Sequence, residues 1–359
     1  MNRHEKAMQI LHEGTVIPAI PLVLDQERKF DAEGQRRLVR YYLSAGVGGV
    51  AAAVHTTQFE IRDPEHQLLR PVLEIVAEEI SRHEDAAGKT LVRVAGVCGE
   101  SPQACKEAAL ASELGFDAVL LSPGGLNHLS EEAMLQRTRD VAGIMPVIGF
   151  YLQNSVGGRR FSFEYWKRLA DIPNVAAIKS APFNRYQTYD LVRGCAFSDR
   201  RDEVALYTGN DDNIVVDLLT PFTFTVDGAP VTKYFAGGLL GHWSVWTAKV
   251  TELFQTIKKY QGQDAIPASL LTLAAQITDC NGAFFDVSNN FAGCIAGIHE
   301  VLRRQGLMEG IWCLNPEETL SPGQSEEISR VCRMYPHLND DAFISSHLAQ
   351  WSRNGEDNG

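Results

Sequence analysis

The sequence predicts an α/β fold of the (β/α)8 TIM-barrel type, followed by a C-terminal helical extension. Eight apolar runs alternate with eight helical stretches between Thr15 and Tyr260. From the fourth run to the eighth, the runs start near residues 117, 146, 174, 204 and 234, which are 29, 28, 30 and 30 residues apart. Such regular alternation implies a parallel sheet covered by helices, and eight units are the number that closes a barrel. A doubly wound open sheet is the alternative, but no GxGxxG motif follows the first run.

Each apolar run has the length and composition of a buried strand, and turn-forming or helix-capping residues bound it. The runs cover residues 15–24, 48–54, 91–97, 117–121, 146–151, 174–179, 204–209 and about 234–240.

Helix-start signals follow several of these runs. Asp31 is a good N-cap for a helix over 33–46, and Ser101-Pro102 opens a helix that ends at Gly115. Ser130 opens a further helix in the same way. The other helices that we expect cover about 63–80, 163–170 and 242–260, with Asp211 or Asp212 as the cap of one within 210–219.

Two segments interrupt the alternation. Residues 221–233 alternate Thr with Phe and contain an Asp227-Gly228 turn, which predicts an inserted hairpin, and we expect this hairpin to lie over the barrel mouth. After about Gln261 only a helical pattern remains. We therefore expect a barrel with a short N-terminal helix over 1–262, a helical region over 263–351 and a disordered tail over 352–359.

Composition and charge restrict the class of partner. The chain has 359 residues and a formal net charge of −12, which disfavours nucleic acid and anionic membranes as partners. It contains no apolar run long enough to span a bilayer, and its charged start does not have the pattern of a signal peptide. Seven scattered cysteines form no CxxC pair and ten histidines show no metal-ligand spacing. We expect a cytoplasmic protein that needs neither a metal nor another cofactor.

Lys179 is the first candidate for a reactive group, because it follows the apolar residues 175–178 at the end of a predicted strand. Burial disfavours the charged ammonium and lowers the pKa of a lysine, and a neutral amine can attack a ketone to form a Schiff base. The simpler alternative is a lysine whose stem is buried while its ammonium reaches water.

The ends of other predicted strands supply polar groups that can complete such a site, since active sites of barrels lie at the carboxyl ends of the strands. Tyr151 ends the fifth strand, and its phenol can transfer protons beside a Schiff base. A Thr-Thr pair can hold a small carboxylate. The substrate-binding residues that we expect are His55, Thr56, Thr57, Gly209, Asn210 and Trp243.

In order and spacing, GFY, AIK, GNDD and GGLLGHWSV resemble the dihydrodipicolinate synthase / N-acetylneuraminate lyase family. The resemblance extends from about Gly14 to Tyr335. It implies a class I aldolase-type enzyme in which Lys179 forms a Schiff base with a 2-oxo acid, usually pyruvate or a substrate that releases it. It further implies that Tyr151 is the acid/base, that Thr56 and Thr57 hold the carboxylate, and that the protein is a homodimer or homotetramer.

The chain also departs from the family pattern. The family's GTTGE or GSTGE is replaced by His55-Thr56-Thr57-Gln58-Phe59, and no second tyrosine follows the fourth strand, where the chain reads SPGGLNH. Val156 stands near the place of the synthases' arginine, with Arg159 and Arg160 further on. His55, His128 or a water molecule is the expected replacement for the missing tyrosine.

Three functions remain open from the sequence. The first is a lyase or aldolase that acts on a 2-oxo acid through Lys179. The second is a hydro-lyase that uses the same imine on a sugar-acid-type 2-oxo acid, and the third is a non-catalytic 2-oxo acid-binding relative.

Overall fold

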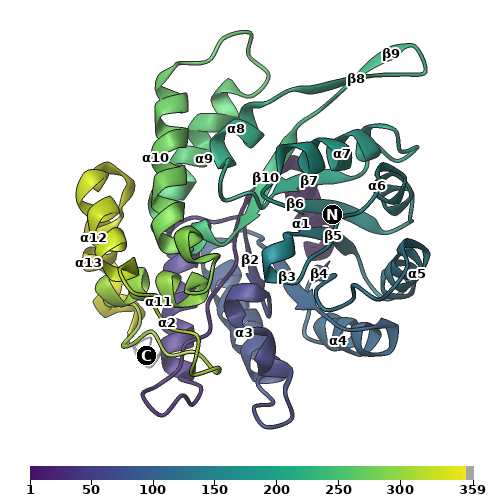
Figure 1. Ribbon diagram of the computed structural model, residues 1–359. Coiled ribbons are helices and arrows are strands. Elements are labelled where there is room, and N and C mark those ends of the chain that lie inside the picture. The colour runs from purple at the N-terminus through teal and green to yellow at the C-terminus, as the bar shows by residue number, and fades with distance from the viewer. Residues whose placement is uncertain (353–359) are drawn as a thin grey trace.

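The computed structural model describes residues 1–352 and contains the eight-stranded parallel barrel that the sequence predicts (Figure 1). Neighbouring strands follow the order β1-β10-β7-β6-β5-β4-β3-β2. An isolated parallel bridge between Ala19 and Ala51 joins the two outer strands, and the N–H of Ile20 donates to the carbonyl of Ala51 at 2.9 Å. The strands are β1 (Val16–Pro18), β2 (Gly49–Ala52), β3 (Val92–Val97), β4 (Ala118–Leu121), β5 (Val147–Leu152), β6 (Val175–Ala181), β7 (Ala205–Thr208) and β10 (Phe235–Leu240).

Helices cover the outside of the barrel, and several begin where the sequence predicts. Asp31 caps α2 by accepting from the N–H of Gly34, and Ser130 caps α5 by accepting from the N–H of Ala133. The helices that follow the strands are α2 (Ala32–Ser44), α3 (Leu69–Ala87), α4 (Ser101–Glu113), α5 (Glu131–Ala142), α6 (Phe163–Ala170), α7 (Arg185–Ala196), α8 (Ile214–Leu219) and α9 (Thr247–Tyr260).

Helix α3 begins later than the predicted residue 63. Gln67 has a φ of 50°, which a right-handed helix does not tolerate, so α3 starts only at Leu69. Two 3-10 turns, η1 (His55–Thr57) and η2 (Phe59–Arg62), occupy part of the segment before it. The turn η1 places the polar residues after β2 at the carboxyl end of the barrel.

The N-terminal helix α1 (Arg3–Glu13) closes the opposite end of the barrel, and Figure 1 shows it in purple behind the strands. Ala7 and Leu11 belong to the apolar cluster that fills the barrel interior. The Tyr207 hydroxyl inside the barrel donates to the carbonyl of Leu11 at 2.8 Å.

The predicted hairpin exists as β8 (Phe222–Val226) and β9 (Ala229–Lys233), but its expected position over the mouth is wrong. It lies in the connection from α8 to β10, and in a barrel such connections run at the amino ends of the strands, away from the active-site face. Figure 1 shows the hairpin extending beside α7, where the ring of Tyr189 lies 5.1 Å from that of Phe224.

The C-terminal helices α10 (Ser269–Phe284), α11 (Cys294–Arg304), α12 (Gln324–Met334) and α13 (Asp341–Trp351) lie together on one side of the barrel (Figure 1). The turn between α10 and α11 reaches the barrel mouth, since Phe285 and Phe291 line the cavity there. Of the tail expected over 352–359, only Ser352 is among the described residues. No helix in residues 1–352 combines the length and apolar character needed to cross a membrane.

Candidate active site

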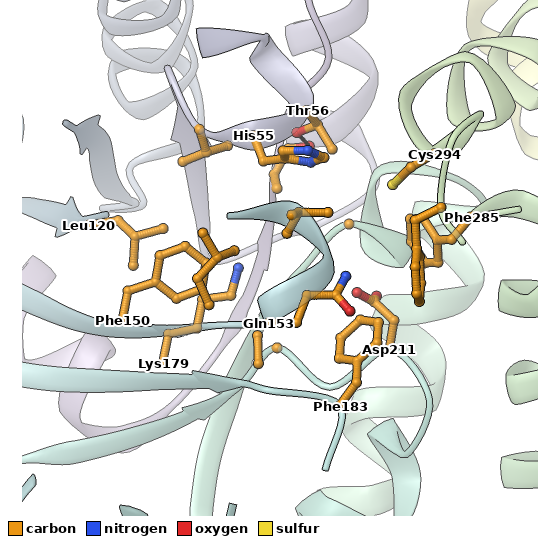
Figure 2. A pocket seen from close by; sticks show the side chains of 18 residues that line it. His55, Thr56, Leu120, Phe150, Gln153, Lys179, Phe183, Asp211, Phe285 and Cys294 are labelled. Atoms are coloured by element: carbon orange, nitrogen blue, oxygen red, sulfur yellow. Dashed lines mark hydrogen bonds between the residues drawn. The ribbon is translucent and has the colours of Figure 1, made fainter. Parts of the chain in front are cut away.

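A cavity of about 70 Å³ opens at the carboxyl ends of the strands, and Lys179 is one of the residues that line it. In Figure 2 the Lys179 amine points into the space between Phe150 on one side and Gln153 and Asp211 on the other, with His55 above. The lining residues come from the ends of most strands and from the C-terminal region: Ala19, Val54, His55, Thr56, Leu120, Phe150, Leu152, Gln153, Val156, Lys179, Ala181, Phe183, Gly209, Asp211, Gly241, Phe285, Phe291 and Cys294. The location agrees with the face on which barrel active sites lie.

A larger outer chamber of about 480 Å³ shares five lining residues with this inner one. The shared residues are Gln153, Phe183, Asp211, Phe285 and Phe291. The two rings of Phe183 and Phe291 meet edge to face with centroids 5.8 Å apart. The site is therefore a small inner chamber around Lys179 and an outer chamber open to solvent, with phenylalanine rings where the two meet.

The environment of Lys179 favours the neutral amine. Its side chain is buried, and this desolvation lowers the pKa of the amine from 10.5 to about 8, although the Asp211 carboxylate acts in the opposite direction. The Lys179 Nζ lies 4.4 Å from the centroid of the Phe150 ring. The backbone also comes close, because a Cβ on Gly209 would lie 2.4 Å from the Lys179 Cε. Gly209 thus provides the space that the lysine stem occupies.

Tyr151 does not lie where the sequence analysis expected it. Its side chain is fully buried among the helices, with its ring 4.7 Å from that of Trp166 and 5.9 Å from that of Phe161. The N–H of Phe161 donates to its phenol oxygen at 3.4 Å. Phe150, which is the register partner of Lys179, points into the barrel instead. Side chains alternate along a strand, so Phe150 and Tyr151 face opposite sides of β5.

The two threonines after β2 differ in position. Thr56 lines the inner chamber, and its hydroxyl donates to the carbonyl of Ala19 at 2.6 Å. Thr57 is fully buried, its hydroxyl donates to the carbonyl of Ile20 at 2.7 Å, and it is not a lining residue. Both hydroxyl protons are therefore engaged with the end of the first strand.

His55 lines the inner chamber, whereas His128 lies on the surface with its Nε2 3.0 Å from a carboxylate oxygen of Glu100. Burial and the nearby Lys179 lower the pKa of His55 to about 4, which keeps its imidazole neutral near pH 7. Of the two histidines considered as proton donors, only His55 is placed to contact a bound molecule.

Asn210 and Trp243 are also absent from the cavity lining. The Asn210 side chain accepts from the N–H of Phe183 and donates to Asp217, so it braces the loop after β6. The Trp243 ring packs against Gly238 and lies 6.0 Å from the ring of Phe254.

Asp211 is the residue whose position sequence reasoning missed. The helix cap of α8 is Asn213, so neither Asp211 nor Asp212 has the predicted capping role. Asp211 instead lines both chambers, and its Oδ1 accepts from the N–H of His242 at 2.9 Å. Burial raises the pKa of its carboxyl from 3.8 to about 7, although the Lys179 ammonium opposes the shift. The GNDD motif identifies the segment, but only the packing of η4 (His242–Ser244) against it shows where the carboxyl points.

The comparisons with known proteins are consistent with this geometry. The model of the dihydrodipicolinate synthetase family matches residues 13–223. An N-acetylneuraminate lyase of Citrobacter koseri is 28% identical over 209 residues, which are 57% of this chain and 65% of that protein. A 4-hydroxy-tetrahydrodipicolinate synthase of Prosthecochloris aestuarii is 26% identical over 192 residues, which are 53% of this chain and 60% of that protein. The matched part is thus less than two thirds of the length of these curated relatives.

Solved structures share the fold over most of the chain. Dihydrodipicolinate synthase from Oceanobacillus iheyensis has a TM-score of 0.71 at 18% identity, covering 94% of this chain and 100% of that one. The chloride-inhibited dihydrodipicolinate synthase from Acinetobacter baumannii, solved in complex with pyruvate, has a TM-score of 0.70 at 19% identity, covering 92% and 99%. The C-terminal helices are therefore part of the shared architecture.

Proposed function

This chain belongs to the dihydrodipicolinate synthetase family, and from that membership we propose that it is an aldolase-type lyase acting on a 2-oxo acid through an imine on Lys179. The 2-oxo acid is pyruvate or a substrate that releases pyruvate. The observation that carries the proposal is the Lys179 amine, which lies at the carboxyl end of β6 in the inner chamber. Its pKa, lowered to about 8 by burial, makes a nucleophilic amine available near neutral pH.

The size of the inner chamber supports a small electrophile. A volume of about 70 Å³ has room for few non-hydrogen atoms, since a single water needs roughly 10–15 Å³ of such volume. Thr56 is the residue that we propose for contact with the 2-oxo acid head, through its main-chain N–H, because its hydroxyl proton is engaged with the carbonyl of Ala19. His55 lies next to it.

The charges of the outer chamber limit what the rest of the substrate can be. Among the described residues that line the two chambers, Lys179 is the only lysine or arginine. Arg159 donates to the carbonyls of Asn127 and Leu129 and does not line either chamber. Asp212 also lines the outer chamber, and its carboxylate would repel a second carboxylate on the substrate. We therefore propose that the group cleaved from, or joined to, the 2-oxo acid has no second carboxylate.

Borohydride trapping tests the central claim. The whole chain is incubated with a panel of 2-oxo acids, reduced with sodium borohydride, and analysed by intact mass and peptide mapping. We expect a covalent adduct on Lys179 that Lys179→Met abolishes. Lys258→Met is the matched control, because burial also lowers the pKa of Lys258 but this residue is not part of either chamber. An adduct on another lysine, or none with any of the acids, contradicts the proposal.

A second candidate function follows from the phenylalanine at position 150. No tyrosine lines either chamber among the described residues, so the chain could bind a 2-oxo acid without turning it over. Exchange of the pyruvate methyl hydrogens in D2O, followed by NMR, separates the two candidates. Trapping together with exchange supports an enzyme, whereas trapping without exchange supports a binding protein. A hydro-lyase would in addition release water from a hydroxylated 2-oxo acid by way of the same imine.

We further propose that the protein is a cytoplasmic homodimer or homotetramer. Closed symmetric homo-oligomers are the commonest state of such enzymes, and all seven cysteines are free thiols. Light scattering at micromolar concentration tests the assembly: a mass of at least two chains of 39.6 kDa is expected, and a mass of one chain contradicts it.

A further inference from the structure

The chemistry proposed for Lys179 needs a group that takes up and returns protons, and the cavity offers few. The titratable side chains that line the two chambers, within the described part of the chain, are His55, Lys179, Asp211, Asp212 and Cys294. Cys294 and His55 are poor candidates, since burial raises the pKa of the thiol well above 9 and lowers the pKa of the imidazole to about 4. Asp212 lines only the outer chamber.

Asp211 is fixed at the junction of the chambers. Its Oδ1 accepts the 2.9 Å hydrogen bond from the N–H of His242, and its main-chain carbonyl accepts from the Asn281 side chain at 2.6 Å. No described residue donates a hydrogen bond to Oδ2, so this oxygen remains available to a bound molecule. Figure 2 shows the carboxyl on the same side of the cavity as Gln153, facing toward the space that the Lys179 amine enters.

The groups around Asp211 leave it able to exist in both protonation states. Burial is the largest influence on its pKa and favours the protonated acid, and Asp212 acts in the same direction. The hydrogen bond from the N–H of His242 and the Lys179 ammonium favour the carboxylate. The nearby His242 and His55 are neutral near pH 7, because burial lowers the pKa of each to about 4. Cys294 stays protonated. A carboxyl whose pKa is raised to about 7 holds a proton in part of the molecules and accepts one in the rest.

We propose that Asp211 is the catalytic acid and base that works with Lys179, in place of a tyrosine phenol. This inference rests on the imine proposed above. As an acid, Asp211 gives its proton to the carbinolamine hydroxyl; the C–O bond breaks, water leaves and the iminium forms. As a base, its carboxylate removes a proton from C3 of the pyruvate iminium, and the electron pair of that C–H bond moves toward nitrogen to give the enamine. In the cleavage direction it takes the proton of the C4 hydroxyl, the C3–C4 bond breaks, and an aldehyde and the enamine result.

The experiment compares Asp211→Asn with the wild type in two assays on the whole chain. Asparagine retains an oxygen that can accept from the N–H of His242, so the loop is expected to keep its structure. The first assay is exchange of the pyruvate methyl hydrogens in D2O, which needs no second substrate. The second is borohydride trapping of pyruvate on Lys179 at equilibrium.

We expect Asp211→Asn to lower the exchange rate by about 100-fold or more, the usual contribution of a general base. The adduct on Lys179 should still form at equilibrium. Loss of the Asp211 carboxylate also removes a charge that raises the pKa of Lys179. If Asp211 acted only through that charge, Asp211→Asn would leave the exchange rate intact and would shift only the pH at which trapping occurs. Asp227→Asn is the matched control, because Asp227 is exposed at the hairpin tip, and its φ of 49° suits asparagine.

The outcomes separate the two proposals. If wild type shows trapping and exchange while Asp211→Asn exchanges at the wild-type rate, Asp211 is not the base. The same conclusion follows if His55→Gln abolishes exchange and Asp211→Asn does not. If wild type forms no adduct with any 2-oxo acid, the proposed imine on Lys179 is contradicted, and so is the role of Asp211, which depends on it.

Discussion

Phe150 of β5 lies opposite Lys179 of β6, and the amine of the lysine is 4.4 Å from the centre of the phenylalanine ring. The two residues are register partners whose side chains both point into the barrel. Tyr151, one residue further along β5, faces the helices instead. Tyr151 therefore follows a residue that contacts Lys179, but its phenol lies on the other side of the sheet from the amine.

The position of Tyr151 predicts a small effect of its substitution. Tyr151→Phe should leave the rate of pyruvate exchange within about 2-fold of wild type, because the phenol has no access to either chamber. The lost acceptor for the N–H of Phe161 should lower the free energy of unfolding by about 0.5–1.5 kcal/mol, measurable by urea titration. Phe150→Tyr is the companion variant, which places a phenol in the inner chamber. A loss of exchange beyond about 10-fold in Tyr151→Phe would show that the phenol has a catalytic role after all.

Gly209 should be intolerant of any side chain. A Cβ there would lie 2.4 Å from the Lys179 Cε and 2.8 Å from the Ala181 Cβ, so Gly209→Ala must displace the lysine. We expect the rate of borohydride trapping to fall by at least about 10-fold, with an overpacking cost of about 1–3 kcal/mol in the free energy of unfolding. Gly143→Ala provides a control elsewhere in the chain, since its φ of −68° suits any residue and its added Cβ would meet no atom closer than 3.4 Å. A folded Gly209→Ala variant that traps pyruvate at the wild-type rate would refute this packing argument.

Phe183 and Phe291 should limit the size of the 2-oxo acid. Both line the inner and the outer chamber, and both have positive φ values, 51° and 68°, which non-glycine residues rarely adopt. Phe291→Ala should raise trapping of 2-oxo-4-phenylbutyrate relative to pyruvate by about 10-fold, because truncation joins the two chambers. Phe197→Ala is the control, since its ring pairs edge-on with Phe163 at 5.6 Å outside both chambers. If the ratio of 2-oxo-4-phenylbutyrate trapping to pyruvate trapping is unchanged in both Phe183→Ala and Phe291→Ala, the two rings do not limit the size of the substrate.

The pKa of Lys179 predicts a specific pH dependence. Imine formation requires the neutral amine of Lys179 and, in the role proposed for Asp211, its protonated carboxyl. The initial rate of trapping should therefore rise from pH 6, reach a maximum between about pH 7 and pH 8, and not rise toward the ordinary lysine value of 10.5. Between these two values the unfolded chain binds more protons at this lysine than the folded chain does, so this lysine makes the folded state more stable as the pH rises. The stability of wild type should therefore increase relative to Lys179→Met from pH 8 to 10.5. A trapping rate that keeps rising to pH 10 would show that the amine is not desolvated.

Several features of the fold could be read from the sequence because they are local. The spacing of the apolar runs follows from the length of one strand plus one helix, and Asp31 and Ser130 cap helices through the N–H groups three residues away. Lys179 could be located in the same way, since an apolar run that ends in a single lysine places that lysine at a strand end.

The sequence of β5 does not show which of its side chains point into the barrel. All six of its residues are buried, because a barrel strand has the interior on one side and helices on the other. The polar-apolar alternation that reveals facing in a half-exposed strand is therefore missing, and a shift of one residue exchanges the two faces. Only the pairing of β5 with β6 shows that Phe150, and not Tyr151, adjoins the lysine.

The sequence by itself determined the barrel, the C-terminal helices and a lysine at the end of the sixth barrel strand. The tertiary structure decided which side chains surround that lysine. Phe285 and Phe291 reach the cavity from the C-terminal region, and the Asp211 carboxyl is held by the backbone of His242 from the segment after β10. Contacts between segments so far apart in the chain depend on how the elements pack, and local patterns of hydrophobicity and capping contain no record of that packing.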